Sequence, residues 1–222
     1  MFLETMLLTL KVALITTIIL FFIGIPIALW ISSTKSKLKP VIETIVSMPL
    51  VLPPSVIGFY LLVFLGPSSA IGSFIEKYFD IRLVLSFEGI LIGSILFSFP
   101  FMIHPIQSGL QSLPTSIIEA SYILGKSKFQ TLMYVQLPNI KNSLLTGIVL
   151  TFAHTVGEFG VVLMVGGNIP GETRLASIAI YDEVEALNYD LANQYALTLF
   201  VISFSILFLV YSINRKFNGV LK

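Results

Sequence analysis

Few side chains in this 222-residue sequence could carry out chemistry. The sequence contains two histidines, His104 and His154, and no cysteine. The lack of cysteine excludes thiol nucleophiles, thiolate zinc sites and disulfides. Two scattered histidines are too few for a histidine metal site. We therefore expect neither a metal site nor a catalytic residue in this chain.

One segment has the spacing of a nucleotide-binding motif. Ala120 to Ser127 resembles the phosphate-binding loop G-x-x-x-x-G-K-[ST], with its first glycine replaced by Ala120. Such a loop follows a strand and needs flexible glycines so that backbone N–H groups can face the phosphates. Here the intervening residues are bulky and helix-forming, and no strand is predicted before them. We interpret the match as coincidence, so that any ATP used would bind to another chain.

The composition identifies the surroundings of these residues. Apolar residues make up 55% of the chain and charged residues only 11%, with a mean hydropathy of +0.93. Soluble domains carry roughly 25% charged residues. The 13 basic and 12 acidic residues give a net charge of +1, which leaves no basic excess for binding nucleic acid. These values predict an all-α, polytopic membrane protein in contact with the lipid bilayer.

Charge-free runs predict the spans, because a helix needs about 20 apolar residues to cross a bilayer. The expected spans are residues 8–33, 44–65, 89–108, 142–165 and 191–214, within one membrane domain over residues 1–222. A sixth span would have to lie in residues 66–86, where four charged residues disfavour it. Pro49, Pro53 and Pro54 predict a kinked second span. His104, beside Pro105, is expected to mark the end of the third.

Basic residues predict the orientation, since they are enriched in cytoplasmic loops. Nine of the 13 fall after the first span, between the third and fourth, and after the fifth: Lys35, Lys37, Lys39, Lys126, Lys128, Lys141, Arg215, Lys216 and Lys222. With these segments inside, nine of the 12 acids lie outside. The N-terminus is then outside and the C-terminus cytoplasmic.

The loop over residues 109–141 is predicted to contain two short helices. Ser116 to Glu119 and Ser127 to Gln130 both fit a capping box, and Gly125 is typical of a helix end. The apolar residues of the first helix could pack on the underside of the membrane domain. They could equally dock into a soluble partner, and the pattern leaves both readings open.

Two charged residues in the second half of the chain are candidates for function. Glu158 is the single acid at membrane depth, where such residues are functional by default. Because it would repel an anion, we expect a structural or gating role, with His154 as its partner four residues earlier. Arg174 could face an entering anion, pair with Glu172, contact a docking protein, or form a simple surface salt bridge.

The loop carries a resemblance to a known family. Glu119-Ala120-Ser121, three residues, Gly125, nine residues and Val135-Gln136-Leu137-Pro138 are similar to the EAA loop of ABC importer permeases. The resemblance implies a type I ABC importer permease fold in the inner membrane. It also implies a non-catalytic homodimer, an ATPase partner holding ATP and Mg²⁺, and an extracytoplasmic binding protein. The ATPase-coupling residues would be Glu119, Ala120, Ser121, Gly125, Leu137 and Pro138.

Further motifs resemble the molybdate branch of that family, namely Leu52-Pro53-Pro54, Gly157 to Gly160 and Gly166 to Arg174. This implies a tetrahedral oxyanion as cargo, molybdate first, with tungstate and sulfate as alternatives. Conduction requires weak binding, so hydroxyls and N–H groups are better contacts than fixed positive charge. The candidates for path or gate are Thr151, Thr155, Gly157, Glu158, Gly160, Asn168, Thr173 and Arg174.

Two other classes of protein fit the sequence poorly. An ion-coupled transporter would be expected to show inverted repeats and coupled ionisable residues, and the sequence shows neither. An intramembrane enzyme would need a nucleophile with a facing base, or paired carboxylates. Glu158 and His154 on one helix do not supply that arrangement.

Overall fold

The computed structural model describes the backbone of residues 1–218 and the side chains of residues 1–212. Lys222 lies outside the described residues. The described chain is helical throughout, without strands. In order, its elements are α1 (Phe2–Ser33), α2 (Lys39–Val51), α3 (Pro54–Leu65), α4 (Ala70–Phe79), α5 (Phe87–Gln111), α6 (Thr115–Ile123), α7 (Lys128–Thr131), the π-helix η1 (Leu132–Gln136), α8 (Leu137–Asn139), α9 (Lys141–Val156), α10 (Gly160–Gly166), α11 (Ala176–Glu185) and α12 (Tyr189–Asn218).

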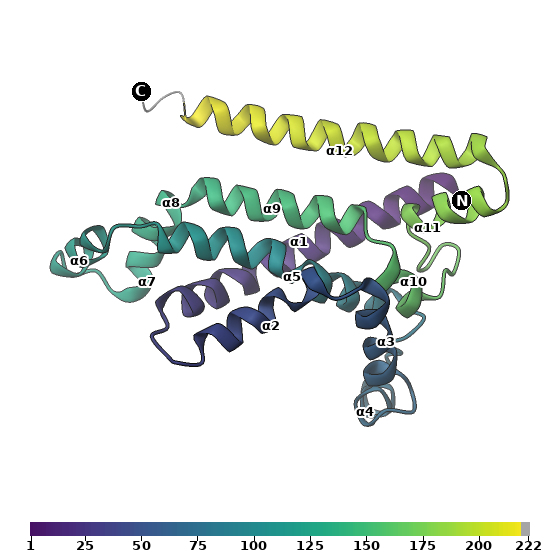
Figure 1. Cartoon of the computed structure of the whole chain (residues 1–222), viewed down its shortest axis with the longest axis horizontal. Coiled ribbons are helices and arrows are strands. Elements are labelled where there is room, and N and C mark those ends of the chain that lie inside the picture. Colours follow the sequence, from purple (N-terminus) through teal and green to yellow (C-terminus); the bar gives the residue numbers. More distant parts are fainter. Residues whose placement is uncertain (219–222) are drawn as a thin grey trace.

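The core lies between α1, α5 and α9, which run side by side (Figure 1). Leu20 and Ile31 of α1 pack with Met102 and Ile106 of α5, and all four side chains are almost completely buried. Apolar residues are distributed all around α1. This pattern suits a helix that contacts other helices on one side and lipid on the other.

The described helices provide three unbroken candidate spans, and the five predicted spans only if each of two bent helix pairs is counted as one. By length and composition α1, α5 and the Tyr189–Ser212 part of α12 can each cross a membrane unbroken. Two further spans are bent pairs, α2 with α3 and α9 with α10. The interval 66–86 holds α4, whose 10 residues extend only about 15 Å, too short for a sixth crossing.

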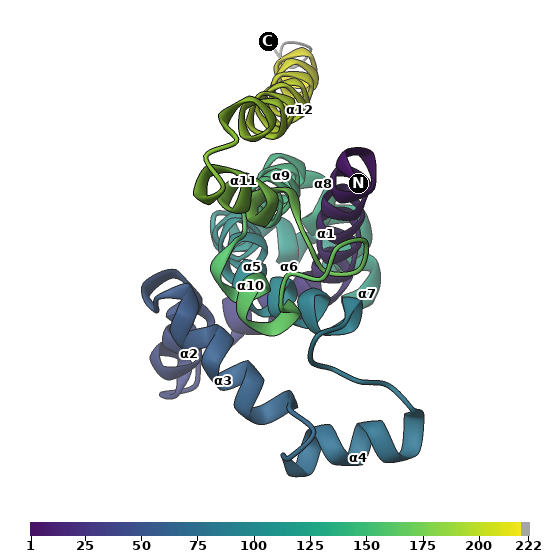
Figure 2. The same ribbon diagram turned by 90° about the vertical axis from the view of Figure 1, so that its right-hand side faces the viewer.

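The second predicted span is broken into two helices and not merely kinked. Its two halves, α2 and α3, meet at 109°, so that α3 leaves the direction of the bundle (Figures 1 and 2). Leu52 and Pro53 each precede a proline, and a residue in that position avoids helical backbone angles. Their ψ angles are 137° and 139°, in the extended region. A double proline therefore produces a break.

The third span is longer than predicted. Helix α5 continues through Pro100 and Pro105 to Gln111, so His104 lies inside the helix and the prediction that it marks the span end is wrong. Proline is tolerated inside a membrane helix because neighbouring groups satisfy the freed carbonyls.

The described chain begins and ends at opposite ends of the bundle (Figure 1). The N-terminus lies at the end opposite to α6 and α7, and α12 finishes at the same end as these two helices (Figure 1). Helix α12 stands beside the bundle, and only 6% of its most apolar window is buried. Phe200, Phe204 and Phe208 form an exposed column along it. In a membrane this face must meet lipid or another chain.

Candidate functional site

The breaks of the two bent helix pairs meet in space. Gly160, which begins α10, lies so close to α3 that a Cβ added to it would be 2.7 Å from the Cβ of Pro54. The second break arises because α9 ends at Val156 and its direction changes by 58° before α10 starts. Irregular backbone at membrane depth is tolerated where it lines a cavity or is buried in protein. The meeting point of the breaks is therefore a candidate site.

A cavity of about 610 Å³ opens at this point. Its lining comes from α3, α5, α9 and the second break: Pro54, Ser55, Phe97, Ala153, His154, Gly157, Glu158, Phe159 and Gly160. None of these residues is a lysine or an arginine. Helix α3 starts here, so its positive end is directed at the cavity. The polar side chains of this lining are the Ser55 hydroxyl, the His154 ring and the Glu158 carboxyl group.

Glu158 is buried in the wall of this cavity. Its exposed fraction is 3%, and neither carboxylate oxygen makes a hydrogen bond within the described chain. The hydroxyl of Ser94 approaches the carboxyl group but is likewise without a hydrogen bond. The predicted pairing with His154 is wrong, because the helix ends between the two residues and the i,i+4 relation is lost.

His154 instead belongs to a polar ladder between α5 and α9. Its Nδ1 lies 3.0 Å from the Ser98 hydroxyl, which lies 2.8 Å from the Thr155 hydroxyl. The Thr155 hydroxyl donates to the Thr151 carbonyl at 2.8 Å. Phe101 stacks on the imidazole with 4.0 Å between ring centroids. Thr151 and Thr155 are therefore fixed inside the bundle, next to the cavity wall.

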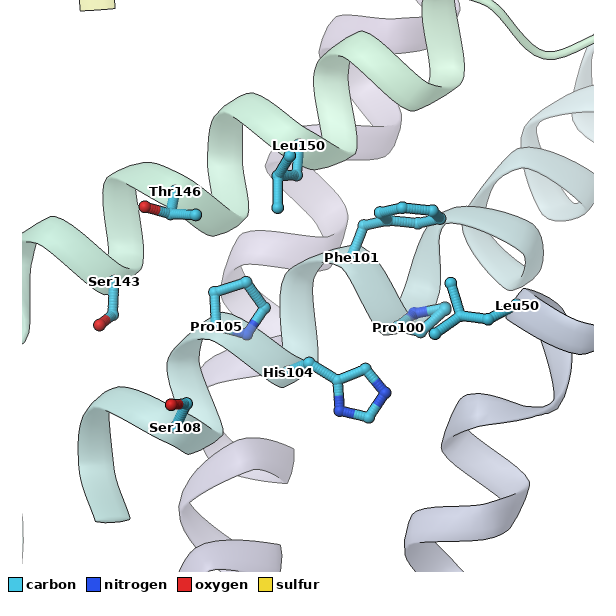
Figure 3. A pocket seen from close by; sticks show the side chains of 9 residues that line it. All are labelled: Leu50, Pro100, Phe101, His104, Pro105, Ser108, Ser143, Thr146 and Leu150. Atoms are coloured by element: carbon cyan, nitrogen blue, oxygen red, sulfur yellow. The ribbon is translucent and has the colours of Figure 1, made fainter. Parts of the chain in front are cut away.

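A second cavity, of about 540 Å³, lies between α2, α5 and α9 (Figure 3). His104 projects from α5 into its lining, together with Leu50 of α2 and Thr146 of α9. Its Nε2 lies 3.1 Å from the Ser47 hydroxyl. Neither His104 nor Ser47 was predicted as a site residue. Two features of the sequence could have pointed to His104. It is one of only two histidines, and it lies between Pro100 and Pro105.

Three predicted path residues lie elsewhere, in the loop between α10 and α11. Arg174 pairs with Asp182 of α11 at 2.6 Å and donates from Nε to Asn168 at 2.9 Å. Asn168 also donates to Asp182 at 2.9 Å. The Thr173 hydroxyl donates to the Gly166 carbonyl and accepts from a backbone N–H. Of the alternatives considered for Arg174, the structure contains a salt bridge, but its partner is Asp182 and not Glu172, because Arg174 reaches across the loop to α11.

The predicted coupling loop forms its two helices. The first capping box is absent, because α6 begins at Thr115 after Pro114 and so places Ser116 inside the helix. The second is present, with Ser127 and Gln130 bonded in both directions. The segment with phosphate-loop spacing is helical up to Ile123, which is unlike a phosphate-binding loop.

Gly125 ends α6 as predicted. Its φ is +76°, which favours glycine. The N–H of Lys126 donates to the Ser121 carbonyl at 3.1 Å and that of Gly125 to Tyr122 at 2.9 Å, the two bonds of a Schellman motif. The buried Ser121 hydroxyl also lies 2.9 Å from that of Thr131 in α7. The turn between the helices is thus well defined.

The apolar tip of this loop does not pack on the membrane domain. Ile123 and Leu124 are 86% and 79% exposed, and Glu119 and Ala120 are also exposed. Leu137 and Pro138 follow the π-helix and belong to α8, which leads back to α9. Of the two readings left open by the sequence, the exposure favours docking into a partner.

Comparison with known proteins places the chain in a family. It belongs to the binding-protein-dependent transport system inner membrane components, whose family pattern matches residues 9–219. The chain is therefore a multi-pass protein of the inner membrane. It is 41% identical to the molybdenum transport system permease protein ModB of Azotobacter vinelandii, over 96% of this chain and 93% of that protein.

Two further likenesses bear on cargo and fold. The chain is 34% identical to the probable sulfate transport system permease protein cysT of Prototheca wickerhamii, over 91% of this chain and 79% of that protein. Among solved structures, it resembles a bacterial ABC transporter involved in alginate import, with a TM-score of 0.79 and 19% identity over 96% of this chain and 79% of that one. The fold is that of a type I ABC importer permease.

Proposed function

We propose that this chain is the non-catalytic permease subunit of an ATP-driven importer for a tetrahedral oxyanion, with molybdate as the cargo. The family membership and the 41% identity to a molybdenum permease carry this proposal. The chemistry of the 610 Å³ cavity is compatible with it, because hydroxyl and backbone donors can hold an oxyanion weakly enough to release it. Tungstate shares this geometry, and sulfate is the alternative suggested by the cysT likeness.

In this proposal ATP and Mg²⁺ bind to a separate ATPase subunit that docks on α6. The exposed apolar side chains of Ile123 and Leu124 give the contact surface, and Glu119 and Ala120 lie on the same short helix. Gly125 and the hydroxyl pair of Ser121 and Thr131 hold α6 against α7. A rigid tip of this kind can transmit a movement of the ATPase to the membrane helices.

The proposal includes a homodimer. The 540 Å³ cavity is lined by α2, α5 and α9, and the 610 Å³ cavity by α3, α5, α9 and the second break, so both lie on the surface to which α5 and α9 contribute and neither is enclosed by a single chain. A second copy facing this surface would close it. An extracytoplasmic binding protein would deliver the anion at the end that carries α11 and the N-terminus. The charge distribution of the loops supports this orientation, with the C-terminus in the cytoplasm.

Substitution of Gly125 tests the coupling assignment. An added Cβ at Gly125 meets nothing within 4 Å, and the same is true of Gly171, whose φ is +80°. Both substitutions to valine therefore strain the backbone equally, but only Gly125→Val adds bulk at the proposed ATPase contact. We expect Gly125→Val to abolish co-purification of the ATPase and ATP-dependent uptake at normal membrane levels.

The Gly171→Val variant is the matched control and should keep the ATPase bound. If both variants retain the ATPase, the docking surface lies elsewhere. The cargo is tested by uptake of labelled molybdate in cells that lack and regain this gene, with tungstate and sulfate as competitors. Uptake inhibited by sulfate but not by tungstate would overturn the molybdate assignment.

A further inference from the structure

The hydrogen bonds around His154 determine which ring nitrogen carries its proton. Three contacts run in series, from His154 Nδ1 to Ser98, from Ser98 to Thr155, and from Thr155 to the Thr151 carbonyl. Each contact needs one hydrogen, and each hydroxyl has only one to donate. The two hydroxyls supply two hydrogens. The third must come from the imidazole, so Nδ1 of His154 is protonated.

The same count applies to His104. The Ser47 hydroxyl donates its one hydrogen to the Glu43 carbonyl at 2.7 Å. Its contact with His104 Nε2 at 3.1 Å then needs a hydrogen from the ring, so Nε2 of His104 is protonated. The two histidines are therefore held in opposite tautomers by two unrelated serines.

In each ring the second nitrogen is left without a hydrogen-bond partner in the described chain. Within the described chain, neither Nε2 of His154 nor Nδ1 of His104 makes a hydrogen bond, and each histidine lines one of the two cavities. In a neutral ring this nitrogen bears a lone pair, which repels an oxyanion. In an imidazolium it is a donor and makes a strong charge-assisted hydrogen bond.

We propose that His154 and His104 are proton-dependent contacts for the transported oxyanion, each of which binds the anion only as an imidazolium. The proposal rests on the proposed function as an oxyanion permease. A proton from water enters the ring when the anion arrives and returns to water when the anion leaves. The site is thus cationic only while it is occupied, which avoids a permanent charge that would trap the anion.

The surroundings of each ring fit this role. Besides His154, the ionisable residue in this cavity lining is Glu158, and α3 and α5 contribute the uncharged Pro54, Ser55 and Phe97. Phe101 of α5 stacks on the ring. Aromatic faces stabilise a cation.

Around His104, the lining from α9 is uncharged, with Ser143, Thr146 and Leu150. On α2, Glu43 accepts from Gln107 and lies 4.0 Å from Lys39, so this carboxylate is already engaged. Neither ring is therefore committed to an ion pair before the anion arrives.

The tautomers can be measured directly. The chain has only two histidines, so ¹⁵N-histidine labelling gives two rings, which His104→Gln and His154→Gln assign. At about pH 8, where an ordinary histidine is neutral, we expect the Nδ1–H tautomer for His154 and the Nε2–H tautomer for His104. An Nε2–H tautomer at His154 would overturn the proposal, because the neutral ring could then donate to an anion.

The functional test uses the full transporter in proteoliposomes, with its binding protein, ATP and molybdate. Uptake is compared at about pH 5 and at about pH 8, one on either side of the pKa of a free histidine. We expect wild-type uptake to fall several-fold more across this range than uptake by His154→Gln or His104→Gln, since glutamine is a donor at both pH values. A merely structural role would reduce uptake by the same factor at every pH.

The Ser98→Ala variant tests the role of the tautomer while the histidine itself is kept. Without the serine, neutral His154 can take the Nε2–H form, so the dependence on pH should weaken although the histidine is present. Thr16→Ala is the control, because Thr16 is a buried residue of α1 whose hydroxyl makes no hydrogen bond in the described chain and which lines neither cavity. If Ser98→Ala keeps the wild-type pH profile, the inference is wrong. If the wild-type transporter does not carry molybdate at all, the proposed function fails instead.

Discussion

At the scale of single residues, the two charged side chains of the second half have roles that their charges alone do not suggest. Arg174, the natural candidate for an anion contact, is engaged with Asp182 and Asn168. Glu158 is buried without a hydrogen bond in a cavity wall. A carboxyl group in that position is free to change partners when the helices move, which fits a gate better than an anion ligand.

The first prediction concerns Arg174. Its contact with Asp182 is about three-quarters buried, with 21% and 26% of the two side chains exposed. Its loss should cost about 1–2 kcal/mol. We expect Arg174→Gln to lower the melting temperature in detergent by a few degrees and to keep most of the uptake. The double variant Arg174→Gln/Asp182→Asn should be no less stable than Arg174→Gln alone.

Additive losses in the double variant would mean that the pair does not stabilise the loop. If Arg174→Gln abolished uptake at normal stability, Arg174 would instead be assigned to the anion path. The two readouts together therefore separate a structural arginine from one that meets the cargo.

At the scale of elements, the cavity depends on the contact between two helix breaks. Pro53 and Pro54 end α2 and start α3, while Gly157 to Gly160 interrupts the fourth span. Gly160 permits the approach, since a larger residue would meet Pro54. The two helix breaks therefore pack against each other, and a cavity lies beside their contact. Irregular backbone is tolerated at membrane depth in such a place.

The second prediction compares two glycines of this break. A Cβ at Gly160 would lie 2.7 Å from Pro54, whereas a Cβ at Gly157 would meet nothing closer than 3.8 Å. Overpacking costs about 1–3 kcal/mol, so Gly160→Ala should reduce thermal stability and uptake. Gly157→Ala should leave thermal stability unchanged. Equal stability of the two variants in a melting assay would show that the breaks do not touch.

At the scale of the whole molecule, the chain is incomplete as a transporter. Its two cavities are both lined in part by α5 and α9, and the column of Phe200, Phe204 and Phe208 on α12 is exposed. These surfaces must be covered by lipid or by other chains. The absence of cysteine makes the question accessible, because any introduced cysteine is the only one in the chain.

The third prediction tests the dimer. Val51 at the end of α2 is 79% exposed beside the cavity face, and Phe22 on α1 is 70% exposed. In membranes, Val51→Cys should cross-link to a second copy under mild oxidation, and Phe22→Cys should not. Strong cross-linking of Phe22→Cys with none at Val51→Cys would place the dimer contact on the other side of the bundle.

The membrane class, the candidate spans, the glycine end of α6 and the start of α7 could be read from the sequence alone. These features depend on local properties, namely the length of apolar runs, the positions of Pro53 and Pro54, and the glycine at residue 125. The capping box at Ser127 was also readable, because its hydrogen bonds join residues three apart. The box at Ser116 was not, since α6 starts after Pro114, two residues earlier than the motif suggested.

Only the tertiary structure decided which residues share the cavity. His154 was assigned to Glu158 by spacing along one helix, but the break after Val156 and the proximity of α5 gave it Ser98 instead. His104 met Ser47, 57 residues away in sequence, and Arg174 met Asp182 across a loop. Hydrogen-bond partners at membrane depth are chosen by which helices pack together, and that packing is a long-range property no local pattern contains.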